Sequence, residues 1–132
     1  MKTIPDPQEP QPLDMQQVAR LNEDLVQRLM DEGVTLTYDE DGDTLFLTIG
    51  RGVLALTEHV VYGIHARIEP ESLHIVGVDI LQFRNRFLAN NELFRVMFEN
   101  DFNNMRSRGG IAVVEGENAK RFHPLFDAML AR

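Results

Sequence analysis

The stretch VTLTYDEDGDTLFLTIG, residues 34–50, decides the fold of the chain more than any other segment. Apolar and polar residues alternate on both sides of an acidic segment, as in strands that are buried on one face. Pairing Tyr38 with Asp43 places both apolar sets on the same face and leaves residues 39–42 as the loop. We expect Gly42 to take the left-handed conformation that such a loop often needs at its last position. The stretch therefore predicts a β-hairpin with an acidic turn.

The acidic turn also raises the question of a metal site. A calcium-binding EF-hand loop that begins at Asp39 requires glycine at its sixth position and glutamate at its twelfth. The chain has Thr44 and Gly50 at these positions, so the pattern fails. The chain has no cysteine, and its four histidines show no spacing typical of helical zinc sites. We therefore expect neither a metal site nor a cofactor.

The remaining segments predict further strands and then a change to helical periodicity. The expected elements are a helix over residues 15–32, strands over 34–38, 43–49, 53–68 (with a bulge at Gly63) and 73–81, a helix over about 90–106, a strand over 111–115, and a C-terminal helix with Pro124 in its first turn. The predicted fold class is α+β, in the order α-β-β-β-β-α-β-α. We expect an antiparallel meander sheet of four to five strands, covered by helices on one face.

Composition limits the class of protein. The chain has 132 residues, of which 43% are hydrophobic and 26% charged, values typical of one globular domain. Residues 1–12 contain four of the six prolines and predict a disordered lead before a single domain at 13–132. No apolar run reaches the ~20 residues of a membrane span, and the first residues lack the apolar stretch of a signal peptide. We therefore expect a cytoplasmic protein that has no contact with a membrane.

The charge is large and unevenly distributed. A net charge of −8 makes nucleic acid an unlikely partner, because phosphate is repelled at long range. Residues 1–83 carry 5 basic and 15 acidic side chains, whereas residues 84–132 carry 8 basic and 6 acidic ones. An acidic body and a basic tail can attract each other within one chain or between two copies. An alternative is a basic patch that binds single-stranded RNA by stacking on neighbouring phenylalanines. The candidate residues for this patch are Arg84, Arg86, Arg95, Arg106 and Arg108.

One carboxylate stands in a strand that is otherwise almost entirely apolar. Asp79 must be paired, hydrogen-bonded or protonated if it is buried. It can form an acid/base pair with Glu58, which would suit an enzyme or a small-ligand binder, or a structural ion pair with Arg67 or His59. The candidate ligand or ion-pair site consists of Asp79, Glu58, Arg67 and His65. No nucleophile-elbow motif and no phosphate-binding glycine pattern is present, so we assign no catalytic residue and do not favour an enzyme.

Two motifs carry a resemblance to a known family. They are YDEDGDTLFL, residues 38–47, and VGVDIL, residues 76–81. In this order they resemble a short bacterial family of domains of unknown function, number 2283, whose members open with Tyr-Asp and a following Asp before Leu-Tyr-Ile and close with Val-Gly-Ile-Glu-Ile-Leu. The chain departs from the family at Phe46, where the family has tyrosine, and at Asp79, where it has glutamate. Glu58 matches an acidic position that the family often carries on its third strand.

The resemblance covers about residues 36–83 and implies mainly a fold. That fold is a compact antiparallel sheet with a helix after it. No activity is established for the family, and some members resemble the antitoxin half of small two-gene modules. The resemblance therefore implies a partner-binding role and transfers no site residue.

These observations favour a small non-enzymatic protein-interaction module. A small sheet leaves two edges open, and three helices with apolar stripes exceed what one sheet face can cover. We therefore expect a homo-oligomer, a dimer in the first instance, or a complex with another protein. The alternatives are an enzyme or small-ligand binder that uses Asp79 with Glu58, and RNA binding through the arginine-rich segment 84–108.

Overall fold

The computed structural model describes residues 14–61 and 63–130. The helices are α1 (Met15–Leu21), α2 (Leu25–Glu32), the π-helix η1 (Phe83–Leu88), α3 (Glu92–Ser107), the 3-10 helix η2 (Gly116–Phe122) and α4 (His123–Leu130). The strands are β1 (Val34–Asp39), β2 (Thr44–Ile49), β3 (Leu56–Val61), β4 (Ile64–Ile68), β5 (Ile75–Ile80) and β6 (Ile111–Val114). The disordered lead predicted for residues 1–12 lies outside the described residues.

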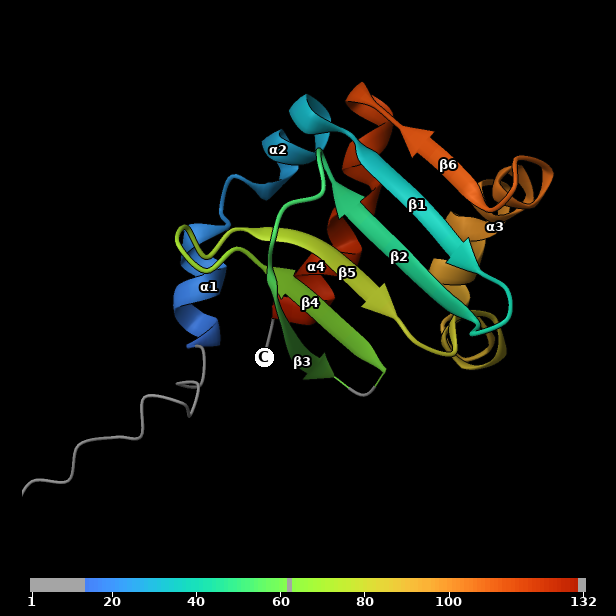
Figure 1. Cartoon of the computed structure of the whole chain (residues 1–132), viewed down its shortest axis with the longest axis horizontal. Coiled ribbons are helices and arrows are strands. Elements are labelled where there is room, and N and C mark those ends of the chain that lie inside the picture. The colour runs from blue at the N-terminus through green and yellow to red at the C-terminus, as the bar shows by residue number, and fades with distance from the viewer. Residues whose placement is uncertain (1–13, 62, 131–132) are drawn as a thin grey trace, which may run out of the picture.

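The strands form one antiparallel sheet in the order β3-β4-β5-β2-β1-β6 (Figure 1). The predicted α+β class is confirmed, but the sheet has six strands rather than four or five. The extra strand arises within residues 53–68, which we predicted as one bent strand and which form β3 and β4. Gly63 has a φ of 77° and lies between these two strands. Its left-handed conformation therefore serves a chain reversal and not the predicted bulge.

The order of the strands also differs from a simple meander. β2 pairs with β5 rather than with β3. The segment 50–55 carries the chain from β2 to the far edge of the sheet, and β3, β4 and β5 then return by consecutive pairing (Figure 1). A continuous alternating pattern reports which residues form strands, but it does not report which strand lies next to which.

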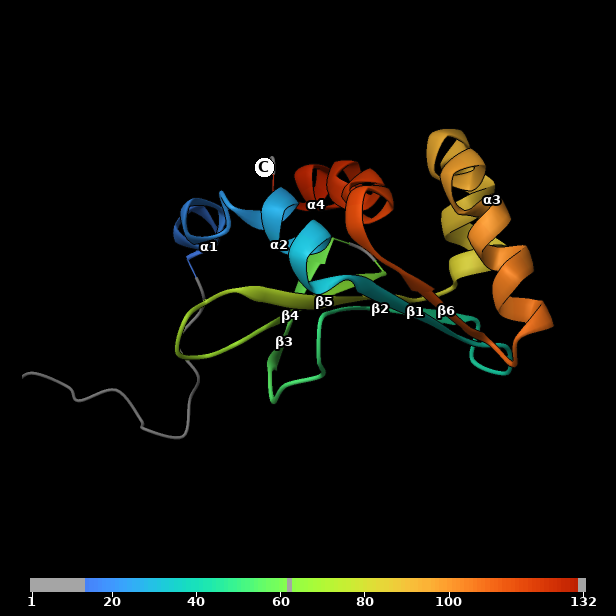
Figure 2. The same cartoon turned by 90° about the horizontal axis from the view of Figure 1, so that it is seen from above.

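The helices of the described residues all lie on one face of the sheet (Figure 2). α1, α2 and α4 cover one side of this face, and α3 rises over the other side near β6. Alternation along the strands directs one apolar set toward the helices, as in the aligned residues Leu36, Leu47, Val78 and Ala66. The helices add fully buried phenylalanines, namely Phe83, Phe98, Phe122 and Phe126. The core therefore lies between the sheet and a single layer of helices, and the opposite face of the sheet carries no described helix.

The acidic turn has a different register from the predicted one. Tyr38 pairs with Leu45 and Asp39 with Thr44, so the loop comprises residues 40–43. The left-handed residue is Asp43, with a φ of 46°, and Gly42 has no positive φ. Our expectation for Gly42 is therefore wrong. Aspartate tolerates the left-handed region better than most residues, and hydrogen bonds to its carboxylate hold Asp43 there.

The helix predicted over residues 15–32 is broken into α1 and α2. The break falls at Asn22, although the apolar spacing continues across it. The side chain of Asn22 is buried and bonds to the start of β5 rather than pointing to solvent. Helical periodicity alone did not reveal this contact, because it depends on a segment more than fifty residues further along the chain.

Candidate functional site

The face of the sheet opposite the helices, which we call the open face, carries two transverse rows of side chains. The strand registers align His59, His65, Asp79, Phe46, Thr37 and Ile111 in the first row. They align Thr57, Arg67, Gly77, Thr48, Thr35 and Val113 in the second row. The open face is thus divided into a polar half on β3, β4 and β5 and an uncharged half on β2, β1 and β6.

An ion pair dominates the polar half. Arg67 Nε lies 3.0 Å from Asp79 Oδ1, and both side chains are largely buried. The same guanidinium donates hydrogen bonds to the carbonyl of Leu47 at 2.8 Å and to Thr48 Oγ1 at 3.0 Å. Nε and Oδ1 themselves have no aligned hydrogen-bond partner, so their contact is electrostatic. Asp79 is therefore neutralised by a neighbouring cation, as the structural alternative in the sequence analysis expected.

Gly77 explains how the guanidinium reaches this position. It is the cross-strand partner of Arg67 on β5 and shares a face with Asp79. A side chain at Gly77 would collide with the guanidinium of Arg67. In the Gly-Val-Asp pattern, Gly77 therefore leaves room for the guanidinium of Arg67, and Asp79 pairs with it. This pairing gives the VGVDIL motif a structural reason that requires no ligand.

The remaining members of the predicted site divide between the two faces. His65 lies beside Asp79 on the open face, and its ring meets that of His59 edge-on, with centroids 5.3 Å apart. Glu58 pairs with Ala66, whose side chain points toward the helices. Glu58 and Asp79 therefore point to opposite faces of the sheet. The geometry brings Asp79, Arg67 and His65 together and gives no acid/base pair between Asp79 and Glu58.

The uncharged half of the open face consists of Thr35, Thr37, Phe46, Thr48, Ile111 and Val113. Three of these side chains are apolar and exposed, with Phe46 at 36%, Ile111 at 49% and Val113 at 60% of their maximal areas. The threonines between them add methyl groups and no charge. An exposed surface of this composition is typical of a face that another protein covers. The sequence marked these positions only as the outward half of each alternating strand.

Asp43 joins the acidic turn to the helical part of the chain. Its carboxylate accepts a hydrogen bond from the Tyr38 hydroxyl at 2.6 Å and from the backbone N–H groups of Arg84 at 2.9 Å and Asn85 at 3.1 Å. Burial opposes ionisation of Asp43, but these hydrogen bonds outweigh it and lower the pKa of the carboxyl group. Burial and the bond to Asp43 raise the pKa of Tyr38 to about 12. The Tyr-Asp-x-x-x-Asp motif therefore caps η1.

Replacing Asp43 with asparagine is expected to destabilise the protein by about 2 kcal/mol at pH 7, because charge-assisted hydrogen bonds become neutral ones. Asparagine keeps the size and tolerates the left-handed φ. The folded pKa of Asp43 lies below its unfolded value of about 3.9, so its contribution is complete above that pH and disappears as the pH falls through the folded pKa. Urea unfolding should therefore show a difference in stability between the two proteins that is constant above a pH of about 4 and shrinks as the pH falls further. Asp41→Asn, in the exposed part of the loop, is the control, and an equal effect of both changes would contradict the assignment.

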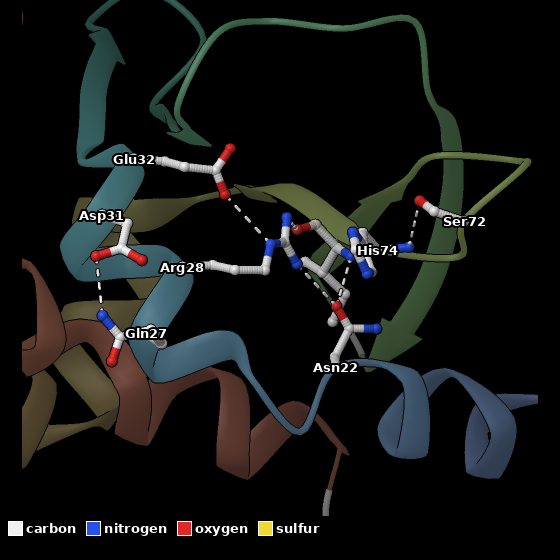
Figure 3. Close-up of polar contacts among 8 residues, drawn as sticks. Asn22, Gln27, Arg28, Asp31, Glu32, Ser72 and His74 are labelled. Carbon is white, nitrogen blue, oxygen red and sulfur yellow. Dashed lines mark hydrogen bonds and ion pairs between the residues drawn. The ribbon is translucent and has the colours of Figure 1, made fainter.

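A second buried polar cluster surrounds Asn22 (Figure 3). The Asn22 amide donates to the carbonyls of Val18 at 2.7 Å and Leu73 at 2.9 Å. Its oxygen accepts from the Ile75 backbone N–H at 2.8 Å and from Arg28 Nη1 at 3.2 Å. One side chain thus fixes the end of α1 to the start of β5. The sequence contains no periodic signal for this contact.

Arg28 completes the second cluster. It lies on α2, donates to the Ile75 carbonyl at 2.9 Å and pairs with Glu32 at 3.3 Å (Figure 3). The backbone N–H of His74 donates to Ser72 Oγ at 3.1 Å in the turn before β5. Each group here already has a partner within the protein. The cluster therefore holds the helices on the sheet.

The five arginines of the predicted basic patch do not all line one groove. Arg84, Arg95 and Arg106 line a groove of about 400 Å³ beside η1 and α3, with the guanidinium carbons of Arg84 and Arg106 each 5.8 Å from the centre of the Phe102 ring. Arg86 lines a different cavity, and Arg108 lies in the turn before β6. The structure therefore brings three of the five arginines together in one groove, which Arg86 and Arg108 do not line.

Acidic side chains also neutralise this groove. Arg95 pairs with Glu92 on the same helix, and Arg106 lies 3.7 Å from Glu40 in the acidic turn. Glu99 lines the groove as well. Phe102 is almost entirely buried and offers no open ring face on which a base could stack. The attraction between acidic and basic parts of the chain operates here within one molecule.

A cavity of about 460 Å³ was not indicated by the sequence. It lies between the ends of β4 and β5, the start of α3 and α4, and its walls are mainly apolar. Apolar residues from each element contribute to it, including Ile80, Phe87, Phe94, Leu125 and Met129. The sequence pattern identifies these residues as core residues and cannot reveal where the packing leaves a gap.

Comparison of the chain with protein-family models, curated proteins and solved structures finds no match in any of the three. The resemblance to the family of unknown function therefore stays a prediction that rests on its two motifs. Within residues 14–61 and 63–130, no helix is both long and apolar enough to cross a membrane. In the same part of the chain, no three His, Asp or Glu side chains gather in an arrangement that could hold a metal ion.

Proposed function

We propose that this protein is a small non-enzymatic interaction module that binds a protein surface, in the first instance a second copy of itself. The observation that carries the proposal is the uncharged half of the open face, where Phe46 on β2 and Ile111 and Val113 on β6 are exposed on either side of the threonines of β1. No described helix covers this face (Figure 2). Burying such a surface against a partner is favourable at roughly 25 cal/mol per Å².

The alternatives have less support. A catalytic use of Asp79 requires a free carboxylate and a second acid, but Asp79 is paired with Arg67 and Glu58 lies on the other face. RNA binding requires a basic surface with accessible rings, whereas the arginine groove contains Glu99 and a buried Phe102. The antitoxin-like role implied by the family resemblance is one form that an interaction module can take. We further propose a cytoplasmic location, which the cysteine-free composition fits.

Replacing Val113 with lysine tests the proposal. Val113 lies in the uncharged half and is 60% exposed, and Val96 on α3 is a matched control at 63%. A lysine in the interface must lose its hydration, so we expect Val113→Lys to weaken association at least about tenfold. Val96→Lys should leave association unchanged.

Light scattering over a range of micromolar concentrations measures this association. The unaltered chain should exceed its monomer mass of 15.1 kDa. Equal behaviour of the two lysine variants would contradict the uncharged half as the interface. A monomer at every concentration would contradict self-association and leave only a foreign partner. Thermal unfolding of both variants checks that the fold is intact, which we expect because lysine is common on edge strands.

A further inference from the structure

β6 forms one edge of the sheet and has free backbone groups. The N–H of Tyr38 donates to the carbonyl of Gly110 at 2.8 Å, which makes these two residues a hydrogen-bonded pair. Hydrogen-bonded and non-hydrogen-bonded pairs alternate along an antiparallel ladder. The backbone groups of Ala112 and Val114 therefore face β1, and those of Ile111 and Val113 face outward. This edge offers two donors and two acceptors to another strand.

The two edges of the sheet are protected very differently. β3, at the opposite edge, carries Glu58 and His59, and its register shifts between His59 and Val61. Charged residues and bulges are the usual devices that prevent strands from pairing at an edge. β6 has the sequence IAVV, with no charge, no proline and no irregularity in its register. The structure thus blocks one edge and leaves the other available.

The ends of β6 carry opposite charges. Arg108 precedes the strand and Glu115 follows it, whereas Arg106 and Glu117 at the same ends already pair with Glu40 and Lys120. If two copies of β6 run antiparallel, the basic end of each strand lies against the acidic end of the other. Parallel pairing would instead place like charges together. Charge complementarity therefore favours an antiparallel partner with the sequence of β6 itself.

We propose that β6 pairs with β6 of a second copy about a twofold axis, so that the two sheets become continuous. This inference rests on the proposed function and places the interface at the β6 edge of the uncharged half. The outward backbone groups fix the register: Ile111 bonds to Val113 of the second copy in both directions, and Ala112 faces Ala112 of the second copy at the axis. This arrangement brings Ile111 and Val113 of both copies together on the open face. The two uncharged halves then form a single surface.

A single cysteine tests the register. The chain has no cysteine, so Ala112→Cys introduces the only thiol. In the proposed register residue 112 forms a non-hydrogen-bonded pair, with Cα atoms about 4.5 Å apart, which lies within the range for a disulfide. Mild oxidation should give a covalent dimer at micromolar concentration. Val96→Cys, exposed on α3, is the control and should give no covalent dimer under the same conditions.

Amide exchange of the unaltered chain gives a second test that requires no substitution. On going from low to high protein concentration, exchange at the Ile111 and Val113 amides should slow at least about tenfold. The Ala112 amide faces β1 in either state, so its exchange should not depend on concentration. Exchange at Ile111 and Val113 that is independent of concentration, together with no Ala112→Cys dimer, would overturn the inference.

A lysine at Phe46 separates this inference from the proposed function. Phe46 lies on β2, two strands away from the edge. Edge pairing therefore predicts that Phe46→Lys keeps the dimer, whereas stacking of the two open faces predicts that it abolishes the dimer. Association that Val113→Lys and Phe46→Lys both disrupt, without protection of the Ile111 and Val113 amides, would uphold the interaction module and reject edge pairing. A chain that remains monomeric at all concentrations would reject edge pairing and self-association together.

Discussion

Replacing Asn22 with leucine should lower the free energy of unfolding by about 4 kcal/mol, because a buried donor and acceptor lose their partner at the same time. Asn22 is only 4% exposed. Leucine has a similar size but cannot satisfy the Leu73 carbonyl or the Ile75 N–H, which lie 2.9 and 2.8 Å from the Asn22 amide group. The guanidinium of Arg28 loses an acceptor as well. Each buried polar group left without a partner costs roughly 1–3 kcal/mol.

Urea unfolding at pH 7 measures this change, and Gln27→Leu is its control. Gln27 also carries an amide and makes a side-chain hydrogen bond, to Asp31 at 2.8 Å, but it is exposed on α2. Its replacement should change the unfolding free energy by no more than about 0.5 kcal/mol. If Asn22→Leu unfolded at the same urea concentration as the unaltered chain, the link between α1 and β5 would contribute nothing to stability.

Replacing Gly110 with alanine is expected to cost about 3 kcal/mol, and the neighbouring Gly109→Ala only about 1 kcal/mol. Both glycines have positive φ, 70° at Gly109 and 89° at Gly110. A Cβ at Gly110 would lie 2.9 Å from the backbone carbonyl oxygen of Tyr38, whereas a Cβ at Gly109 would have no neighbour within 4 Å. Gly109→Ala therefore measures only the cost of a side chain at positive φ. Gly110→Ala adds a collision with the backbone of β1.

Thermal and urea unfolding of the two alanine variants measure this difference. The collision at Gly110 also acts on the hydrogen bond between Tyr38 N–H and the Gly110 carbonyl, which aligns β6 with β1. Amides at the start of β6 should therefore exchange faster in Gly110→Ala than in Gly109→Ala. Equal losses of stability in the two variants would show that φ alone determines the cost and that the approach to Tyr38 is relaxed without strain.

The sequence predicted those parts of the fold that depend on local patterns. The hairpin of β1 and β2, the helix α3, the strand β6 and the position of Pro124 in α4 all follow from alternation or helical spacing. The predicted hairpin paired Tyr38 with Asp43, whereas the structure pairs Tyr38 with Leu45. A displacement of two residues keeps the apolar side chains of both strands on the same face, so the prediction of the buried face was correct. We assigned the left-handed conformation of the loop to Gly42, because glycine adopts it most easily. The structure places it at Asp43, whose carboxylate accepts hydrogen bonds from the backbone of η1.

The features that the sequence did not predict depend on contacts between distant segments. The pairing of β2 with β5 and the break at Asn22 both require knowledge of which segment lies alongside. The same limit applies to the candidate site. Arg67 and Asp79 are close because Gly77 lies opposite Arg67, and Glu58 is excluded because it lies one residue out of phase with the open face. Alternation within each strand was known, but the registers that combine the strands were not.

The contacts of Arg67 have a consequence for the rates of folding and unfolding. β1 and β2 form one local hairpin, and β3, β4 and β5 form another local unit, so the pairing of β2 with β5 joins two parts that can assemble separately. Arg67 extends from β4 across β5 and bonds to the Leu47 carbonyl on β2. Bonds that span the junction require both parts to be in place, so we expect them to form late in folding. They should therefore slow the opening of the sheet while leaving its rate of formation nearly unchanged, which makes Arg67 a determinant of kinetic stability.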